Sequence, residues 1–370
     1  CSRIPFSAID TQHMSAALVL ASQAIGLSDP NPRVGCVIVA PDGRVIGQGH
    51  TQAAGCAHAE VAALQDASNQ NQTLAGATAY VTLEPCSHFG RTPPCCDALI
   101  AAKLARVVVA VQDPNPLVAG QGASRLRAAG IQVDIGLLSE PASELNIGFF
   151  HRMNHGKPWV RMKTAATLDG KTALMNGVSQ WITSTEARTD GHRFRRRAGA
   201  VLTGIGTILE DDPRLDVRLV ATAMQPLRVV VDSRLETPGH AKILNEPGKC
   251  LIAHAQAEPT RATALAARGA ELIQIASPSG KVDLSALLIN LANRQVNELH
   301  IEAGHKLNAS FLREGLVDEL LLYLAPKLVG PGRDLAALPE LHSLDGALNL
   351  QWHSMDRIGA DIRILARISK

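Results

Sequence analysis

Apolar and polar positions in the first 150 residues alternate between two periods. Ala- and Leu-rich stretches have the period of a helix, whereas short runs of consecutive apolar or β-branched residues are typical of buried strands. Helices are predicted at 14–24, 57–67, 95–104 and 122–129, and strands at 34–40, 45–49, 77–83, 106–111 and 131–135. Strands that alternate with helices favour a layered α/β fold.

The second half of the chain resumes this alternation after a boundary. Residues 139–153 are predicted to form one connecting helix, and Gly156 and Pro158 mark the boundary that follows. Further strands are predicted at 159–163, 200–203, 227–232, 249–254, 271–275, 298–302 and 319–325. We therefore expect two domains, residues 1–153 with a core at about 8–135, and residues 154–370.

Composition narrows the class of protein. Hydrophobic residues make up 46% of the 370 residues and charged residues 19%, which is typical of compact globular domains. A formal charge of +2 and 3% aromatic residues argue against a nucleic-acid partner. We see no apolar run of the ~18 residues that span a membrane and no secretory signal. Seven cysteines are an odd set and favour reduced thiols, so we expect a cytoplasmic protein.

The first domain contains candidate metal ligands that are spread along the sequence. His58 and Glu60 open a predicted helix, and Cys86 and Cys95 are each predicted to lie near the start of a helical segment. One imidazole and two thiolates can hold Zn²⁺ with one coordination position open, as in catalytic zinc sites. Residues two apart on a helix point to different sides, so Glu60 is expected to shuttle protons rather than bind the metal.

The loop between the two cysteines is longer than the two residues of the usual deaminase pattern. Eight residues separate Cys86 from Cys95, and the loop includes His88 and Arg91. We infer that this loop contacts the substrate and that Arg91 meets a phosphate. The alternative is a closed structural zinc site in which Cys96 is the fourth ligand or replaces Cys95.

Two other features of the first domain carry competing interpretations. Cys36 and Cys56 are expected to be buried small hydrophobes, with Cys56 as a ligand the less favoured alternative. Asn31 and Asn115 each stand between prolines, which stiffen the chain. Their amides could hydrogen-bond the edge of a base, or each could belong to an ordinary Asn-Pro turn.

Two strand–glycine–helix junctions lie in the second domain, at 204–207 and 304–308. Glycine lets backbone N–H groups approach an anion at a helix N-terminus, and two such junctions suit the phosphates of a dinucleotide. Neither is the G-x-G-x-x-G fingerprint, and each could be an ordinary turn. The basic stretch 192–197 is either a solvated helix face or a site for a substrate phosphate or the 2′-phosphate of NADP.

Taken together, these motifs resemble the bifunctional deaminase–reductase family of riboflavin biosynthesis over nearly the full chain. The matching segments are 30–36, 58–60, 82–95, 113–116, 163–171, 179–183, 211–213 and 302–304. The resemblance implies a cytidine-deaminase-like α/β/α domain followed by a dihydrofolate-reductase-like α/β domain. It further implies hydrolytic deamination of 2,5-diamino-6-ribosylamino-4(3H)-pyrimidinone 5′-phosphate and then NADPH-dependent reduction of the ribosyl side chain to ribityl.

The resemblance also implies a role for each matching position. His58, Cys86 and Cys95 would bind zinc, and Glu60 would be catalytic. The residues implied to contact NADP are Ala165, Trp181, Thr207, Asp211, Ser233, Gly304, His305, Lys306, Leu307, Asn308, Ala309 and Ser310. The residues implied or inferred to contact substrate are Ser179, Arg195, Leu215, Arg218, Glu302, Lys163, Asn31, His88, Arg91 and Asn115.

Rival interpretations differ in what the second domain does. One is a zinc deaminase of nucleosides or nucleotides that carries an inactive or differently specific reductase-like domain. Another is a zinc-stabilised interaction protein, which predicts that Glu60→Gln leaves function intact. The family resemblance also suggests a homodimer or tetramer.

Overall fold

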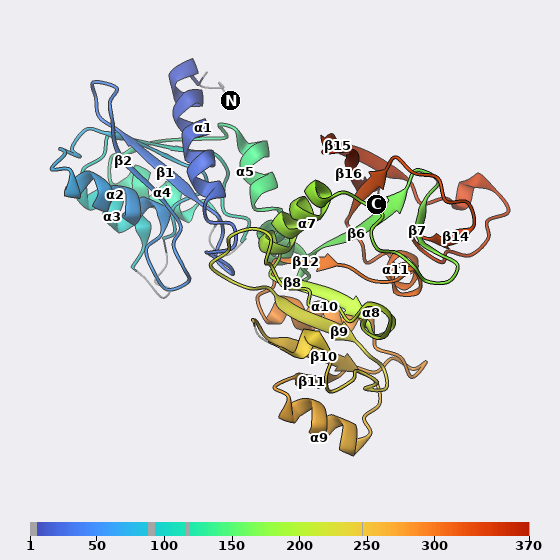
Figure 1. The fold of residues 1–370 in the computed structure, drawn as a ribbon. Helices are drawn as coiled ribbons and strands as arrows, with labels where there is room; N and C mark the ends of the chain where they lie inside the picture. The colour runs from blue at the N-terminus through green and yellow to red at the C-terminus, as the bar shows by residue number, and fades with distance from the viewer. Residues whose placement is uncertain (1–5, 88–92, 116–118, 246, 370) are drawn as a thin grey trace. The chain divides into compact units, whose positions relative to one another are not determined.

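The computed structural model describes residues 6–87, 93–115, 119–245 and 247–369. The chain forms two compact units, Cys1–Gly156 and Lys157–Lys370, and each is described by itself (Figure 1). Among the described residues, every helix is too short or too polar to cross a bilayer.

The first unit is built on a five-stranded sheet in the order β2-β1-β3-β4-β5. β1 pairs antiparallel with β2 and β3, and the β3–β4 and β4–β5 pairs are parallel. The strands are β1 (Gly35–Val39), β2 (Val45–His50), β3 (Thr78–Val81), β4 (Arg106–Val109) and β5 (Gln132–Ile135). The helices are α1 (Ala8–Ser22), α2 (Ala59–Asn69), α3 (Cys95–Ala101), α4 (Gln121–Ala128), α5 (Ser139–Leu145) and α6 (Ile147–His155).

Both faces of this sheet are covered, which gives an α/β/α sandwich. In β1, Cys36 and Ile38 face a core that includes residues of α2, α3 and α4. Val37 and Val39 face a second core that includes Met14 of α1 and Ala142 of α5. Alternate residues of one strand thus reach opposite cores, and the deaminase-like fold expected for the first domain is confirmed.

The second unit is built on a nine-stranded sheet in the order β11-β10-β9-β8-β12-β6-β13-β16-β15. The pairs from β11 to β13 are parallel, and β16 and β15 continue the sheet antiparallel. The strands of the sheet are β6 (Trp159–Thr167), β8 (Ala200–Gly204), β9 (Leu227–Val231), β10 (Cys250–His254), β11 (Glu271–Gln274), β12 (Glu298–Ile301), β13 (Glu319–Ala325), β15 (Leu350–Ile358) and β16 (Asp361–Ile368). A separate two-stranded sheet pairs β7 (Lys171–Leu174) with β14 (Gly332–Asp334).

Helices cover both faces of the larger sheet as well. In β8, Leu202 packs in a core that includes α10 and α11, and Val201 packs in a core that includes α8 and α9. The helices are α7 (Thr185–Arg197), α8 (Ile205–Asp211), α9 (Pro259–Ala267), α10 (Leu284–Asn293) and α11 (His305–Arg313). The predicted α/β class of this domain is confirmed.

The structure corrects the prediction of one connecting helix at 139–153. The helix is broken at Asn146, which separates α5 from α6. The buried amide of Asn146 accepts a hydrogen bond from the Arg33 N–H (2.7 Å) and donates one to the Arg33 carbonyl (2.8 Å). This pairing across 113 residues of chain interrupts the helix, because it holds Asn146 outside helical geometry (φ −112°, ψ 20°).

Four strands were not predicted from the sequence: β7, β14, β15 and β16. β15 is one of the two edge strands of the large sheet and is exposed along most of its length. A strand without a buried face lacks the alternating pattern on which prediction depends. β16 does carry that pattern, since Ile364 and Ala366 are buried at alternate positions, so alternation could have revealed it.

Candidate active sites

The first site begins at the N-terminus of α2. His58 is the N-cap of this helix, and Glu60 lies in its first turn. The helix packs unusually close to β2, where a Cβ on Gly49 would lie 2.5 Å from the Ala63 nitrogen and 2.7 Å from the Ala59 carbonyl. Only glycine allows that approach. The close packing of α2 on β2 therefore fixes the position of the N-terminus of α2, which carries His58 and Glu60.

The two cysteines come from different local structures. Cys95 is the first residue of α3, as predicted. Cys86 lies in the irregular segment after β3. Its predicted place near the start of a helical segment stays a prediction, because residues 88–92 lie outside the described residues. The sulfur of Cys86 meets a helix N-terminus, because the Cys95 N–H donates to the Cys86 Sγ at 3.3 Å. That N–H favours the thiolate, which is the form that binds metal.

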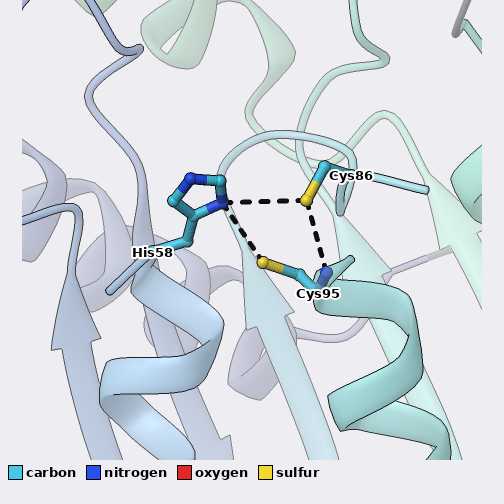
Figure 2. Close-up of side chains that lie close together, drawn as sticks. All are labelled: His58, Cys86 and Cys95. Atoms are coloured by element: carbon cyan, nitrogen blue, oxygen red, sulfur yellow. Dashed lines mark hydrogen bonds between the residues drawn. The ribbon is translucent and has the colours of Figure 1, made fainter. Parts of the chain in front are cut away.

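The three side chains converge on one point (Figure 2). His58 Nδ1 lies 3.7 Å from Cys86 Sγ and 3.3 Å from Cys95 Sγ, and all three donor atoms lie within 4.8 Å of one another. Ligands at zinc bond lengths in a tetrahedron stand about 3.6 Å apart. The residues therefore fit Zn²⁺ and would hold it with one coordination position open.

Electrostatics distinguish the two thiols and shift the pKa of Glu60. A hydrogen bond between the two cysteine side chains lowers the pKa of Cys86 to about 4 and raises the pKa of Cys95. Glu60 is buried, and burial is the largest cause that raises its pKa to about 7, followed by the Cys86 thiolate. A carboxyl with a pKa near neutrality can both take and release a proton.

The neighbouring cysteines do not complete a closed site. The Cys96 Sγ points away from the cluster toward the carbonyls of Pro85 (3.4 Å) and Gly122 (3.6 Å). Cys36 is buried, as expected, but Cys56 is exposed, which corrects the prediction that it packs in the core. The exposure follows from its position in the turns between β2 and α2.

Glu84 is a structural residue of this site that the sequence reading missed. Its buried carboxylate accepts hydrogen bonds from the N–H groups of Asp113 (3.2 Å), Gly120 (2.9 Å) and Ala123 (3.0 Å). These contacts tie the 113–115 loop and the start of α4 to the residue that precedes Pro85 and Cys86. The position of Glu84 in the sequence Glu84-Pro85-Cys86, two residues before a predicted metal ligand, could have indicated this role.

The remaining predicted residues of the first domain are placed only in part. Asn31 is half-buried in the loop before β1, and its N–H donates to the Ser28 carbonyl. Asn115 is half-buried, with its N–H bonded to the Asp113 side chain (2.8 Å). Their substrate contacts remain predictions. His88 and Arg91 lie outside the described residues.

The second site is a cavity of about 720 Å³ in the second unit. It extends along the carboxyl ends of β8 and β12, where the two predicted glycine junctions lead into α8 and α11. Ligands of open α/β sheets bind at this edge. The predicted residues that line it are Lys163, Ala165, Ser179, Trp181, Arg195, Thr207, Asp211, Leu215, Arg218, Glu302, Gly304, His305 and Asn308.

A half-buried ion cluster forms one wall of this cavity. Arg195 makes a two-pronged ion pair with Glu302, at 2.5 and 2.9 Å, and the Lys163 Nζ lies 3.9 Å from Glu302. Burial lowers the pKa of Lys163, whereas Arg195 and Lys163 outweigh the burial of Glu302 and hold its pKa well below the ordinary value. Burial and the two arginines Arg195 and Arg218 lower the pKa of His192 to about 4.

The basic stretch 192–197 is therefore not a uniformly solvated face. Arg195 is largely buried and paired, whereas Arg193 is exposed. Ser233, Lys306, Leu307, Ala309 and Ser310 were predicted to contact cofactor but do not line the cavity, and Leu307 and Ala309 pack into the core. Their cofactor contacts stay predictions. Arg188, Arg214, Lys242 and Arg333 line the cavity without having been predicted.

Comparison with known proteins identifies the family. The RibD C-terminal domain matches residues 158–364, and the cytidine and deoxycytidylate deaminase zinc-binding region matches residues 7–111. The riboflavin biosynthesis protein RibD of Escherichia coli (strain K12) is 45% identical over 367 residues, which cover 95% of this chain and 98% of the relative. The chain belongs to the RibD family. The RibD of Aquifex aeolicus is 42% identical and covers 96% of this chain and 98% of the relative.

Solved structures agree with this assignment. Acinetobacter baumannii RibD matches with a TM-score of 0.89 at 41% identity, over 98% of this chain and 99% of that chain. The Thermotoga maritima diaminohydroxyphosphoribosylaminopyrimidine deaminase/5-amino-6-(5-phosphoribosylamino)uracil reductase matches with a TM-score of 0.87 at 31% identity, over 98% and 99%. As a RibD family member, the chain is a bifunctional riboflavin-biosynthesis enzyme that joins a zinc deaminase to an NADPH-dependent reductase.

Proposed function

We propose that the first unit deaminates 2,5-diamino-6-ribosylamino-4(3H)-pyrimidinone 5′-phosphate and that the second unit reduces the ribosyl chain of the product. The observation that carries the first step is a buried carboxylate, Glu60, beside a complete three-ligand zinc site to which it does not belong. A spare carboxylate has no purpose in a structural zinc site, but it is the proton shuttle that deamination requires.

In the first reaction, zinc and Glu60 have different roles. Zinc, when bound, polarises the attacking water. Glu60 takes a proton from that water and passes it to the neighbouring ring nitrogen as the hydroxyl adds to the ring carbon that bears the amino group. Glu60 then transfers the remaining hydroxyl proton to the departing amino group. The carbon–nitrogen bond breaks, ammonia leaves, and the ring carbonyl forms.

The second reaction needs a hydride at C1 of the ribosyl group and a proton on the ring oxygen that leaves this carbon. NADPH, when bound, supplies the hydride. We assign proton delivery to Lys163, which lines the cavity and whose pKa is lowered by burial, so its ammonium is a better acid than an exposed lysine. Asp211 is a second polar group at the same cavity.

Glu60→Gln tests the deaminase. The variant should retain zinc, because Glu60 is not a ligand, and should lose at least about 100-fold in ammonia release. Reduction of the deaminated substrate should continue at the wild-type rate. Cys95→Ser should lose zinc, whereas Cys96→Ser, whose sulfur points away, should keep it. Full-rate ammonia release by Glu60→Gln would refute the mechanism.

We also propose that the chain forms a homodimer or tetramer and acts in the cytoplasm, where the zinc thiols stay reduced. The self-association proposal is supported by β15, an edge strand on which Trp352 is 68% exposed and Met355 60% exposed. Uncovered apolar edge strands invite pairing. Trp352→Lys should lower the mass measured by light scattering, and a monomeric wild type would contradict the proposal. Cell fractionation tests the compartment.

A further inference from the structure

The segment that joins β7 to α7 contains three consecutive main-chain carbonyls that are each held by a cationic side chain. The Lys327 Nζ donates to the carbonyls of Trp181 (3.1 Å) and Ile182 (2.8 Å). The Arg188 Nη1 donates to the carbonyl of Thr183 at 2.9 Å. The path of the chain is therefore fixed at residues 181–183, although they are neither helix nor strand.

The surroundings of this segment are also tied to the large sheet. The Asp361 carboxylate of β16 accepts hydrogen bonds from the Ser184 N–H and the Ser184 hydroxyl, both at 2.7 Å, and Ser184 is the N-cap of α7. Lys327 follows β13, and its carbonyl accepts a hydrogen bond from the Leu168 N–H at 2.9 Å, just beyond the end of β6. The segment is thus anchored to β16 and to the chain that follows β6 and β13.

The side chain that this segment presents to the cavity is the indole of Trp181. Trp181 lines the cavity and is 62% exposed. The guanidinium carbon of Arg188 lies over the indole, 4.4 Å from the ring centroid, and such a cation–π contact favours one orientation of the ring. The same guanidinium bonds the Thr183 carbonyl and, through Nη2, the Thr185 hydroxyl (2.9 Å). These two hydrogen bonds hold Arg188 in place over the ring.

We propose that Lys327 and Arg188 are positioning residues that hold the Trp181 indole as a preformed platform for the nicotinamide ring of the cofactor. Lys327 fixes the main chain of the platform, and Arg188 fixes the orientation of its ring. The inference rests on the reductase function proposed above and on the predicted contact between Trp181 and NADP. A side chain that is already ordered loses little conformational entropy when a ligand ring packs on it.

The place of Trp181 in the chain favours the nicotinamide end of the cofactor over its adenosine end. Hydride transfer requires the nicotinamide to lie beside the substrate, whereas the adenosine takes no part in the chemistry. Ser179, which is predicted to contact substrate, stands two residues before Trp181, and both residues line the cavity. A cofactor contact so close to a substrate contact belongs where the two ligands meet.

Lys327 separates positioning from direct contact with the ligand. Arg188 lines the cavity, so its own charge can attract an anionic cofactor. Lys327 is not part of the cavity lining, and its ammonium is bound to the Trp181 and Ile182 carbonyls. An effect of Lys327 on cofactor binding must therefore pass through the segment that carries the indole.

The direct test is calorimetric titration of the zinc-loaded full chain with NADPH and with adenosine 2′,5′-bisphosphate, which lacks the nicotinamide. Lys327→Met should raise the Kd of NADPH about fivefold, the worth of one aromatic contact, and leave the Kd of the bisphosphate unchanged. Lys327→Arg keeps the donors and should recover most of the NADPH affinity. Lys249→Met is the matched control, because it removes the same charge from an exposed lysine at the amino end of β10, outside the cavity lining. Both of its Kd values should equal those of wild type.

Kinetics supply a second readout, which also serves where Lys327→Met does not fold. Arg188→Lys keeps the charge but loses the planar group that stacks on the indole, so it should raise the KM for NADPH and leave the KM for the pyrimidine unchanged. An NADPH Kd unchanged in Lys327→Met would overturn the platform, as would equal losses of NADPH and bisphosphate affinity. A rise confined to the KM for the pyrimidine would place the substrate ring on Trp181 instead. Absence of NADPH binding by the wild type would contradict the reductase function itself, whatever the variants do.

Discussion

Glu84→Gln should destabilise the first unit more than most single substitutions. Among the described residues, three main-chain N–H groups donate to the carboxylate, two to Oε2 and one to Oε1. An amide has one accepting oxygen, so its NH₂ group would face at least one of these N–H groups. An unpaired buried donor costs about 1–3 kcal/mol, and hydrogen bonds to a charged group are stronger than the neutral bonds that replace them. The expected loss is about 2–4 kcal/mol.

Zinc release can be followed during thermal unfolding to measure this loss of stability. It reports on the first unit, which contains both Glu84 and the candidate zinc site. For a unit of this size the loss corresponds to roughly 5–10 °C in the zinc-release midpoint. Glu258→Gln is the matched control, because Glu258 also accepts two N–H groups at a helix start, but on an exposed surface. Its zinc-release midpoint should not move. An unchanged midpoint in Glu84→Gln would refute the reasoning that this carboxylate holds the cysteine segment in place.

Three other predictions concern the first unit. Burial raises the pKa of Asp10, but hydrogen bonds led by Arg106 outweigh it and hold that pKa well below its ordinary value. Asp10 therefore contributes stability above about pH 4 that is lost in acid, and Asp10→Asn should lower the free energy of unfolding more at pH 7 than at pH 3; an equal loss would contradict this. Gly49→Ala should displace α2, cost about 1–3 kcal/mol and weaken zinc binding, whereas Gly239→Ala, with open space around it, should not; equal zinc affinities would contradict it. Removal of zinc by a chelator should abolish ammonia release and leave reduction of the deaminated substrate intact, and loss of both would show that zinc serves more than the deaminase.

The candidate zinc ligands could be chosen from the sequence because the chemistry of a metal ligand belongs to each residue by itself. One histidine and two cysteines, with a carboxylate two positions beyond the histidine, suit few other purposes, and the structure brings His58, Cys86 and Cys95 together. The two glycine junctions were predicted for a similar reason, since each lies where a strand meets a helix.

What could not be predicted depends on contacts between distant residues. The break at Asn146 comes from its pairing with Arg33. The hydrogen bonds from Lys327 to the Trp181 and Ile182 carbonyls join residues that lie 146 and 145 positions apart in the chain. No period or spacing in a single sequence encodes either arrangement.

We propose that one chain performs both reactions in a fixed order. The zinc-loaded enzyme, given the diaminopyrimidine ribosyl phosphate and NADPH, can be followed for ammonia release and NADPH oxidation in the same sample. Ammonia should appear first, and one NADPH should then be consumed for each ammonia released. NADPH oxidation without ammonia release would contradict it.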